Sequence, residues 1–95
     1  MINNDNKIEY LYVGVSPKPF KGLNYWYIDE EKVSKPNTYV WGRMGSHNRE
    51  QILYVDSVQL FTKDKAPYPV EKTRRIIRQT TKEESLEADE NWFTL

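Results

Sequence analysis

Five prolines and four glycines divide this chain into short runs that are rich in β-branched and aromatic residues. The runs cover 8–15, 23–28, 38–41 and 51–61, and each is bounded by proline, glycine or a polar stretch. Runs of this length and composition are typical of strands, because an amphipathic helix needs a longer pattern with a period of 3.6 residues. The sequence therefore predicts a protein built mainly from short strands joined by turns.

The connections between these runs add detail. Two glycines and an asparagine, residues that tolerate positive φ, make 42–48 a predicted hairpin. Apolar residues of the run 51–61 fall on both parities, which predicts a long strand that bends. A charged loop is expected at 62–66. The segment 70–80 fits a helical stripe and a strand about equally, and we interpret it as a turn of helix at 70–72 followed by a closing strand.

A chain of 95 residues has room for one small domain. We expect a flexible N-terminus at 1–7, a β domain at 8–81 and an acidic tail at 82–95 that is either mobile or a short helix. The predicted fold class is mostly β: a small antiparallel barrel of the SH3-like or OB-like kind, with about five strands and at most one or two short helices.

The composition argues against catalysis and against a metal or cofactor. The chain has no cysteine and one histidine, His47, which lies at the predicted hairpin tip. Pairs of carboxylates occur in polar runs without the apolar surroundings that raise the pKa of a general acid. No Gly-rich phosphate-binding motif is present. We therefore expect no catalytic residues, no metal site and no cofactor.

The net charge of zero conceals an uneven distribution. Residues 1–60 carry seven charges of each sign, residues 61–82 carry seven basic and two acidic ones, and residues 83–95 carry five acidic ones. Cations beside aromatic rings such as Tyr68 favour single-stranded nucleic acid, whose phosphates meet the cations while its bases stack on the rings. Two alternatives stay open: the cations face water, or they pair with the acidic tail.

Three separated segments, 23–26, 40–45 and 69–77, occur in the order and at roughly the spacing of a known domain. They resemble the N-terminal DNA-binding domain of the primosomal replication-restart helicase PriA, and the likeness spans about 23–80. The chain is also similar to small proteins of Gram-positive bacteria and their mobile elements that carry this domain without the helicase. The resemblance implies a compact barrel that captures the 3′ end of a DNA strand.

Carried over position by position, the resemblance names a binding site. Leu23 and Asn24 stand where the family has Phe and Asp, and Tyr25 matches the family's tyrosine. Gly45 matches the glycine of the family's hairpin, and Arg74 stands at its basic pocket residue. Arg43 and Met44 replace the family's proline and aromatic residue at the hairpin. The charge pattern adds three expected phosphate contacts: Lys72, Arg75 and Arg78.

These observations predict a stand-alone, non-catalytic module that binds single-stranded or 3′-ended DNA. The alternative is a phage or mobile-element protein-interaction or regulatory factor that acts on host replication or defence machinery. That alternative draws on the acidic-aromatic end of the chain, 89–93, as a docking tail for a protein partner. If the tail instead folds back over the basic segment, deleting it is expected to strengthen DNA binding.

The remaining expectations concern surroundings and assembly. No stretch approaches the length of a membrane-spanning segment and the first residues are polar, so the expected location is the cytoplasm, with no membrane partner. A small open barrel leaves strand edges exposed, which keeps a homodimer open as an alternative to a monomer.

Overall fold

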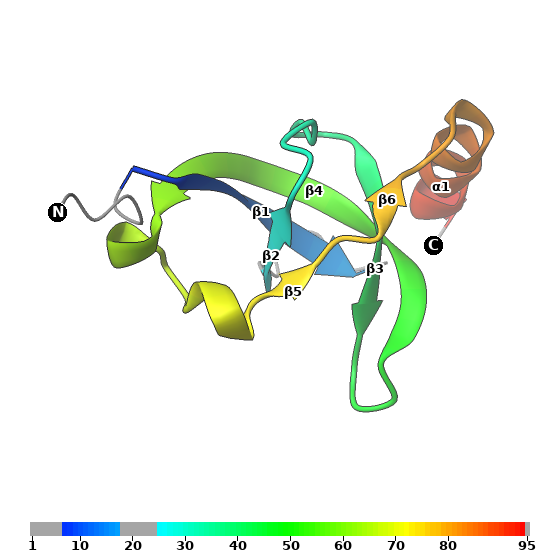
Figure 1. Ribbon diagram of the computed structural model, residues 1–95. Coiled ribbons are helices and arrows are strands. Elements are labelled where there is room, and N and C mark those ends of the chain that lie inside the picture. The colour runs from blue at the N-terminus through cyan, green and yellow to red at the C-terminus, as the bar shows by residue number, and fades with distance from the viewer. Residues whose placement is uncertain (1–6, 18–24, 95) are drawn as a thin grey trace, which may run out of the picture.

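The computed structural model describes residues 7–17 and 25–94, with side chains described as far as Asp89. Within these residues, six strands form one curled sheet in the order β5-β2-β1-β4-β3-β6 (Figure 1). The predicted mostly β class and small barrel-like fold are therefore confirmed. The strands are β1 (Glu9–Pro17), β2 (Tyr25–Asp29), β3 (Tyr39–Met44), β4 (Arg49–Thr62), β5 (Arg74–Arg75) and β6 (Arg78–Gln79).

The sheet curls because its two edge strands are neighbours in the sequence. β5 pairs with β2 at one edge and β6 pairs with β3 at the other, yet only Ile76 and Ile77 separate them. Two residues reach about 7 Å when extended, so β2 and β3 must approach each other. The Ile76 N–H donates to the carbonyl of Ile28 (3.0 Å), and the Ile77 N–H donates to the carbonyl of Trp41 (2.7 Å). The expected closing strand is thus a seam, residues 74–79, that joins both edges.

β1 is the central strand, and both of its faces are buried. Its antiparallel ladders with β2 and β4 cover most of its length. Because side chains alternate along a strand, odd-numbered residues of β1 point to one face and even-numbered residues to the other. The odd face enters the main core, whose buried members are Leu11, Val13, Val15, Tyr27, Val40, Leu53 and Val55.

The opposite face of β1 supports a second, smaller core. Tyr12 is fully buried there with Ile28 and Val70, under the segment that carries the 3₁₀ turns η2 (Lys63–Lys65) and η3 (Val70–Lys72). The Tyr12 ring meets Phe61 edge to face at a centroid distance of 5.5 Å, and its hydroxyl donates to the carbonyl of Tyr68 (2.6 Å). This core therefore fixes the path of the chain that leads into the seam.

β4 is a long strand that bends, as the sequence predicts. Gly14 faces Ser57 but Val15 faces Val55, so Asp56 is an extra residue on β4 and forms a β-bulge. The long curved ribbon of β4 is visible in Figure 1. Leu53 and Val55 enter the main core before the bulge, and Val58 packs against that core after it. The residues of β4 that face the main core are therefore odd-numbered before the bulge and even-numbered after it, which confirms the predicted bend.

Several element boundaries differ from the expected ones. β1 continues to Pro17, and β3 continues through Gly42 to Met44 because these residues keep their ladder with β4. The hairpin turn is confined to residues 45–48, with the Asn48 N–H bonded to the carbonyl of Gly45 (3.0 Å). The charged loop expected at 62–66 contains the 3₁₀ turn η2. The turn of helix expected at 70–72 is present as η3.

The acidic end of the chain forms the helix α1 (Lys82–Thr94). Thr81 and Glu84 make a capping box, in which the Glu84 N–H donates to the Thr81 hydroxyl (3.2 Å) and the Thr81 N–H donates to the Glu84 carboxylate (2.8 Å). Of the two alternatives for this segment, the helix is the one observed. Along 7–17 and 25–94, no helix has the length and apolar character needed to cross a membrane. The N-terminus expected to be flexible lies almost entirely outside the described residues.

Candidate nucleic-acid interface

A pocket of about 430 Å³ opens between the start of β2, the β3–β4 hairpin and the chain around η3 and β5. These elements are far apart in the sequence, and the seam brings them together. The pocket therefore depends on the closure of the sheet. Its lining residues are Tyr25, Trp26, Tyr27, Met44, Gly45, Ser46, Tyr68, Lys72, Thr73 and Arg74.

Arg74 is held at this pocket by the barrel itself. β5 pairs in parallel with β2, which sets Arg74 opposite Tyr27. The Arg74 guanidinium donates to the carbonyl of Arg43 (2.8 Å), and the buried Tyr27 hydroxyl donates to the same carbonyl. Burial raises the pKa of Tyr27, and the nearby Arg74 partly opposes that shift, so Tyr27 stays a neutral donor. A guanidinium has five N–H donors, so this bond orients Arg74 without exhausting it.

Gly42 lets Tyr27 reach that carbonyl. Gly42 is buried, and a Cβ built there would lie 2.7 Å from a methyl carbon of Leu53 and 3.2 Å from the Tyr27 ring. In the hairpin turn, Gly45 has φ +85°, a left-handed conformation that glycine adopts without strain. The two hairpin glycines thus have different tasks: Gly42 provides space, and Gly45 provides the turn.

Two exposed tyrosines accompany the cations. Tyr25 is 50% exposed and Tyr68 is 48% exposed, and both line the pocket with Lys72 and Arg74. The Tyr68 backbone is fixed by the bond from Tyr12, so its ring stands on a rigid support. Aromatic faces beside cations form the combination that binds bases and phosphates of a single strand. The sequence pointed to Tyr68 as an aromatic neighbour of the cations but did not place it in the site.

The predicted site residues divide into three groups. Tyr25, Gly45 and Arg74, which the resemblance names, line one pocket together with Lys72, a predicted phosphate contact. Leu23 and Asn24 lie outside the described residues. Arg75 and Arg78 do not line this pocket. Five further residues line the pocket without having been predicted as site residues: Trp26, Tyr27, Met44, Ser46 and Thr73. Trp26, Met44 and Thr73 lie within the segments that carry the resemblance, whereas Tyr27 and Ser46 are brought there by their tertiary neighbours.

Arg75 is bound to carbonyl groups of the neighbouring backbone. Its guanidinium donates to the carbonyls of Val70 and Thr73, both at 2.6 Å, and so braces η3 against β5. Its Nε also lies 3.7 Å from the carboxylate of Glu30. The side chain is one-third exposed. Phosphate contact by Arg75 stays a prediction, and we do not include it in the interface.

Arg78 lies at the β6 end of the seam, where α1 holds its side chain. It donates two hydrogen bonds of 2.9 Å to the Glu84 carboxylate, and its guanidinium carbon lies 5.3 Å from the centre of the Trp41 ring. The hydrogen bonds from Arg78 and Thr81 lower the pKa of Glu84 to about 2. The acidic segment therefore meets the basic segment at Arg78 and leaves the pocket uncovered by residues 82–89. A phosphate contact by Arg78 stays a prediction too.

The helix has a second attachment, which bears on its expected role as a docking tail. The hydroxyl of Tyr39 donates to the Asp89 carboxylate (2.6 Å), and Ala88 is buried. Burial and the nearby Asp89 carboxylate both raise the pKa of Tyr39. The side chains of 90–93 lie outside the described ones, so a protein contact through them stays a prediction.

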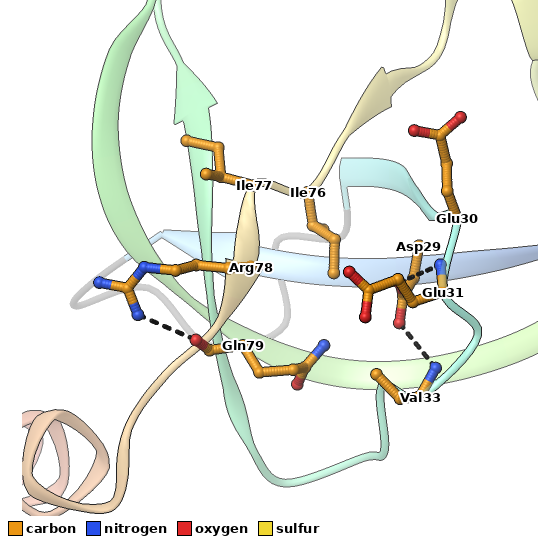
Figure 2. Close-up of a pocket in the computed structure, with 8 residues that line it drawn as sticks. All are labelled: Asp29, Glu30, Glu31, Val33, Ile76, Ile77, Arg78 and Gln79. Carbon is orange, nitrogen blue, oxygen red and sulfur yellow. Dashed lines mark hydrogen bonds between the residues drawn. The ribbon is translucent and has the colours of Figure 1, made fainter.

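A second hollow, of about 260 Å³, lies between the loop that follows β2 and residues 76–79 of the seam (Figure 2). Asp29 forms its base and accepts four hydrogen bonds of 2.7–3.0 Å, from the N–H groups of Glu31, Val33 and Ser34 and from the Ser34 hydroxyl. Burial alone would raise the pKa of Asp29, but these hydrogen bonds outweigh it and lower the pKa below its usual range. Asp29 is therefore an ionised, structural carboxylate.

Comparison with known proteins adds nothing to this geometry: no protein-family model, no curated protein and no solved structure matches the chain. The function must therefore be argued from the pockets and from the residues that line them.

Proposed function

We propose that this protein is a non-catalytic DNA-binding module that takes single-stranded or 3′-ended DNA into the pocket between β2, the β3–β4 hairpin and β5. The observation that carries the proposal is the meeting of Tyr25, Tyr68, Lys72 and Arg74 at one open pocket. The resemblance of the sequence to the DNA-binding domain of PriA supports the same reading, because three of the residues it names, Tyr25, Gly45 and Arg74, belong to this lining.

The chemistry assigns a task to each side chain. Lys72 and Arg74 attract phosphates. The hydrogen bond from Arg74 to the Arg43 carbonyl holds the guanidinium in one orientation, so its remaining N–H groups face a phosphate from a fixed direction. Tyr25 and Tyr68 offer rings on which a base stacks. A Cβ built at Gly45 would meet no neighbouring atom within 4 Å, so DNA can come close to the backbone of the turn. The zero net charge is compatible with this role because binding depends on the local charge of the pocket.

Fluorescence anisotropy with a labelled oligonucleotide tests the proposal. With two cations on phosphates, the plot of log affinity against log salt for a single strand should have a slope of about −1.4. Arg74→Gln should halve that slope, and Tyr25→Ala should weaken binding about fivefold or more through lost stacking. Oligonucleotides with a free and with a phosphorylated 3′ end separate end recognition from general single-strand binding.

Lys35→Gln is the matched control, because Lys35 is exposed and lies on the loop between β2 and β3, away from the pocket. It removes the same charge as Arg74→Gln and should change neither affinity nor slope by a measurable amount at moderate salt. The proposal fails if the wild-type protein shows no binding at about 50 µM in low salt, or if Lys35→Gln and Arg74→Gln weaken binding equally.

A further inference from the structure

The second hollow lies between the loop that follows β2 and the strand β6. Ile76 forms part of its floor, and Val33 and Ile77 stand at its edge with 51% and 41% of their surface exposed. The Gln79 amide donates to the Ser34 hydroxyl (2.8 Å), which in turn donates to Asp29 (2.7 Å). The hollow is thus a braced feature of the fold with apolar side chains open to solvent.

The charge at this hollow is negative. Three carboxylates line it, from Asp29, Glu30 and Glu31, against one guanidinium, from Arg78. Glu30 already lies 3.7 Å from Arg75, and Asp29 accepts four hydrogen bonds from the loop, so Glu31 is the carboxylate that an incoming cation would meet. Figure 2 shows the Arg78 guanidinium directed away from the carboxylates, and both of its hydrogen bonds to a side chain go to Glu84. The Glu31 carboxylate is directed toward Ile76, and among the described residues it has no ion-pair partner within 4.0 Å.

Size and shape restrict what can fill it. Pockets for small-molecule ligands have volumes of about 300–1,000 Å³. At about 260 Å³ the hollow falls below that range and suits a single large side chain. The occupant must cover apolar surface at Val33 and Ile77 and also place a cation at Glu31. An arginine side chain meets both requirements, because its aliphatic stem packs on apolar groups while its planar guanidinium pairs with a carboxylate through two parallel hydrogen bonds.

We propose that this hollow docks an arginine side chain presented by an extended segment of a partner protein. The guanidinium pairs with Glu31, and the stem lies on Val33 and Ile77. The proposal is independent of DNA binding, since the two hollows share no lining residue.

The test uses the full chain, labelled with ¹⁵N, and three short capped peptides of sequence Gly-Leu-X-Leu-Gly. X is arginine, citrulline or glutamate; citrulline has the shape of arginine without its charge. We expect the arginine peptide to shift the amide signals of 30–34 and 76–79 with a dissociation constant in the millimolar range or below. The citrulline peptide should bind about three- to fivefold more weakly, the value of an exposed charged pair, and the glutamate peptide more weakly still.

Glu31→Gln should bring the arginine peptide to the affinity of the citrulline peptide. Glu71→Gln is the matched control, because Glu71 is exposed on η3 and lies outside the hollow. The spectrum of each variant shows directly whether it is folded. Equal binding of the arginine and citrulline peptides, signal changes that spread over the whole sheet, or no localised shift at several millimolar peptide would each overturn the proposal.

Discussion

At the scale of single residues, the packing of β3 against the main core requires that position 42 carry no side chain. A methyl group at this position would lie at 2.7 Å from Leu53 and at 3.2 Å from Tyr27, well inside normal contact distances. Gly42→Ala should therefore force the main core to rearrange and lower the free energy of unfolding by about 1 to 3 kcal/mol. Urea unfolding monitored by tryptophan fluorescence measures this change.

The other hairpin glycine supplies the control. Gly45 has φ +85°, but no atom lies within 4 Å of a Cβ built there. Asparagine tolerates this conformation better than most residues, so Gly45→Asn should cost less than Gly42→Ala although it adds a larger side chain. If both variants unfold at the same urea concentration, steric contact with Leu53 and Tyr27 is not what selects glycine at position 42.

At the scale of elements, α1 is attached to the barrel through a carboxylate that is ionised down to low pH. The pKa of Glu84 lies at about 2, below its ordinary value, because Arg78 and the Thr81 N–H stabilise the charged form. The stabilisation is therefore complete above about pH 4.5, where glutamate is ionised in the unfolded chain as well. As the pH falls from there toward 2, the contribution decreases, and α1 should detach and fray.

The α1 signals of 82–88 in NMR spectra recorded between pH 6 and pH 2 test this expectation. Asp29 has a lowered pKa too, so a local measurement at α1 is needed to distinguish the helix from the loop. Glu84→Gln lacks the ionised pair with Arg78 at every pH, so its α1 signals should show a weaker dependence on pH. The same loss of helix in both proteins would assign the acid sensitivity to another group.

The sequence predicted which segments form strands and turns better than it predicted where the strands end and which strands pair. Local composition was enough for the main strands, for the turn at 70–72 and for the bending of the strand 51–61, because β-branched runs, prolines and parity are local signals. The position of the bend at Asp56 comes from the register with β1. Strand ends such as Pro17 and Met44 depend on the ladder with β4, which lies far along the chain. The capping box of Thr81 and Glu84 was present in the sequence and would have favoured the helix over a mobile tail.

The candidate site was predictable only in part, because motif positions can be identified in a sequence whereas the hydrogen-bond partners of a side chain depend on the fold. Motif spacing pointed to Tyr25, Gly45 and Arg74, and these residues line one pocket. The three expected phosphate contacts stay predictions, but only Lys72 lies at this pocket. The pair of Arg78 with Glu84 is an instance of the alternative in which basic residues pair with the acidic tail. The backbone carbonyls that accept from Arg75 cannot be predicted from a charge pattern.

At the scale of the whole molecule, the acidic helix and the basic pocket occupy different ends. In Figure 1, α1 lies beyond β6 at the upper right, whereas the turn of the β3–β4 hairpin lies at the bottom, below β3, and η3 (yellow) lies beyond β5 on the left. The attachments of α1 are to Tyr39, Arg78 and Thr80, none of which lines the pocket. We therefore no longer expect the acidic segment to cover the pocket. We expect it to weaken DNA binding only by long-range electrostatic repulsion between its carboxylates and the phosphates.

Such an effect must depend on salt. Glu83 and Glu87 are exposed on α1, and the double variant Glu83→Gln, Glu87→Gln removes two charges while it keeps the capping box and the pair with Arg78. Charges are screened over about 8 Å at 0.15 M salt and about 30 Å at 0.01 M. The variant should therefore bind single-stranded DNA as the wild type does at 0.15 M salt and about two- to threefold more tightly at 0.01 M. A large gain in affinity already at 0.15 M would mean that α1 reaches the pocket, which the contacts of Arg78 and Tyr39 argue against.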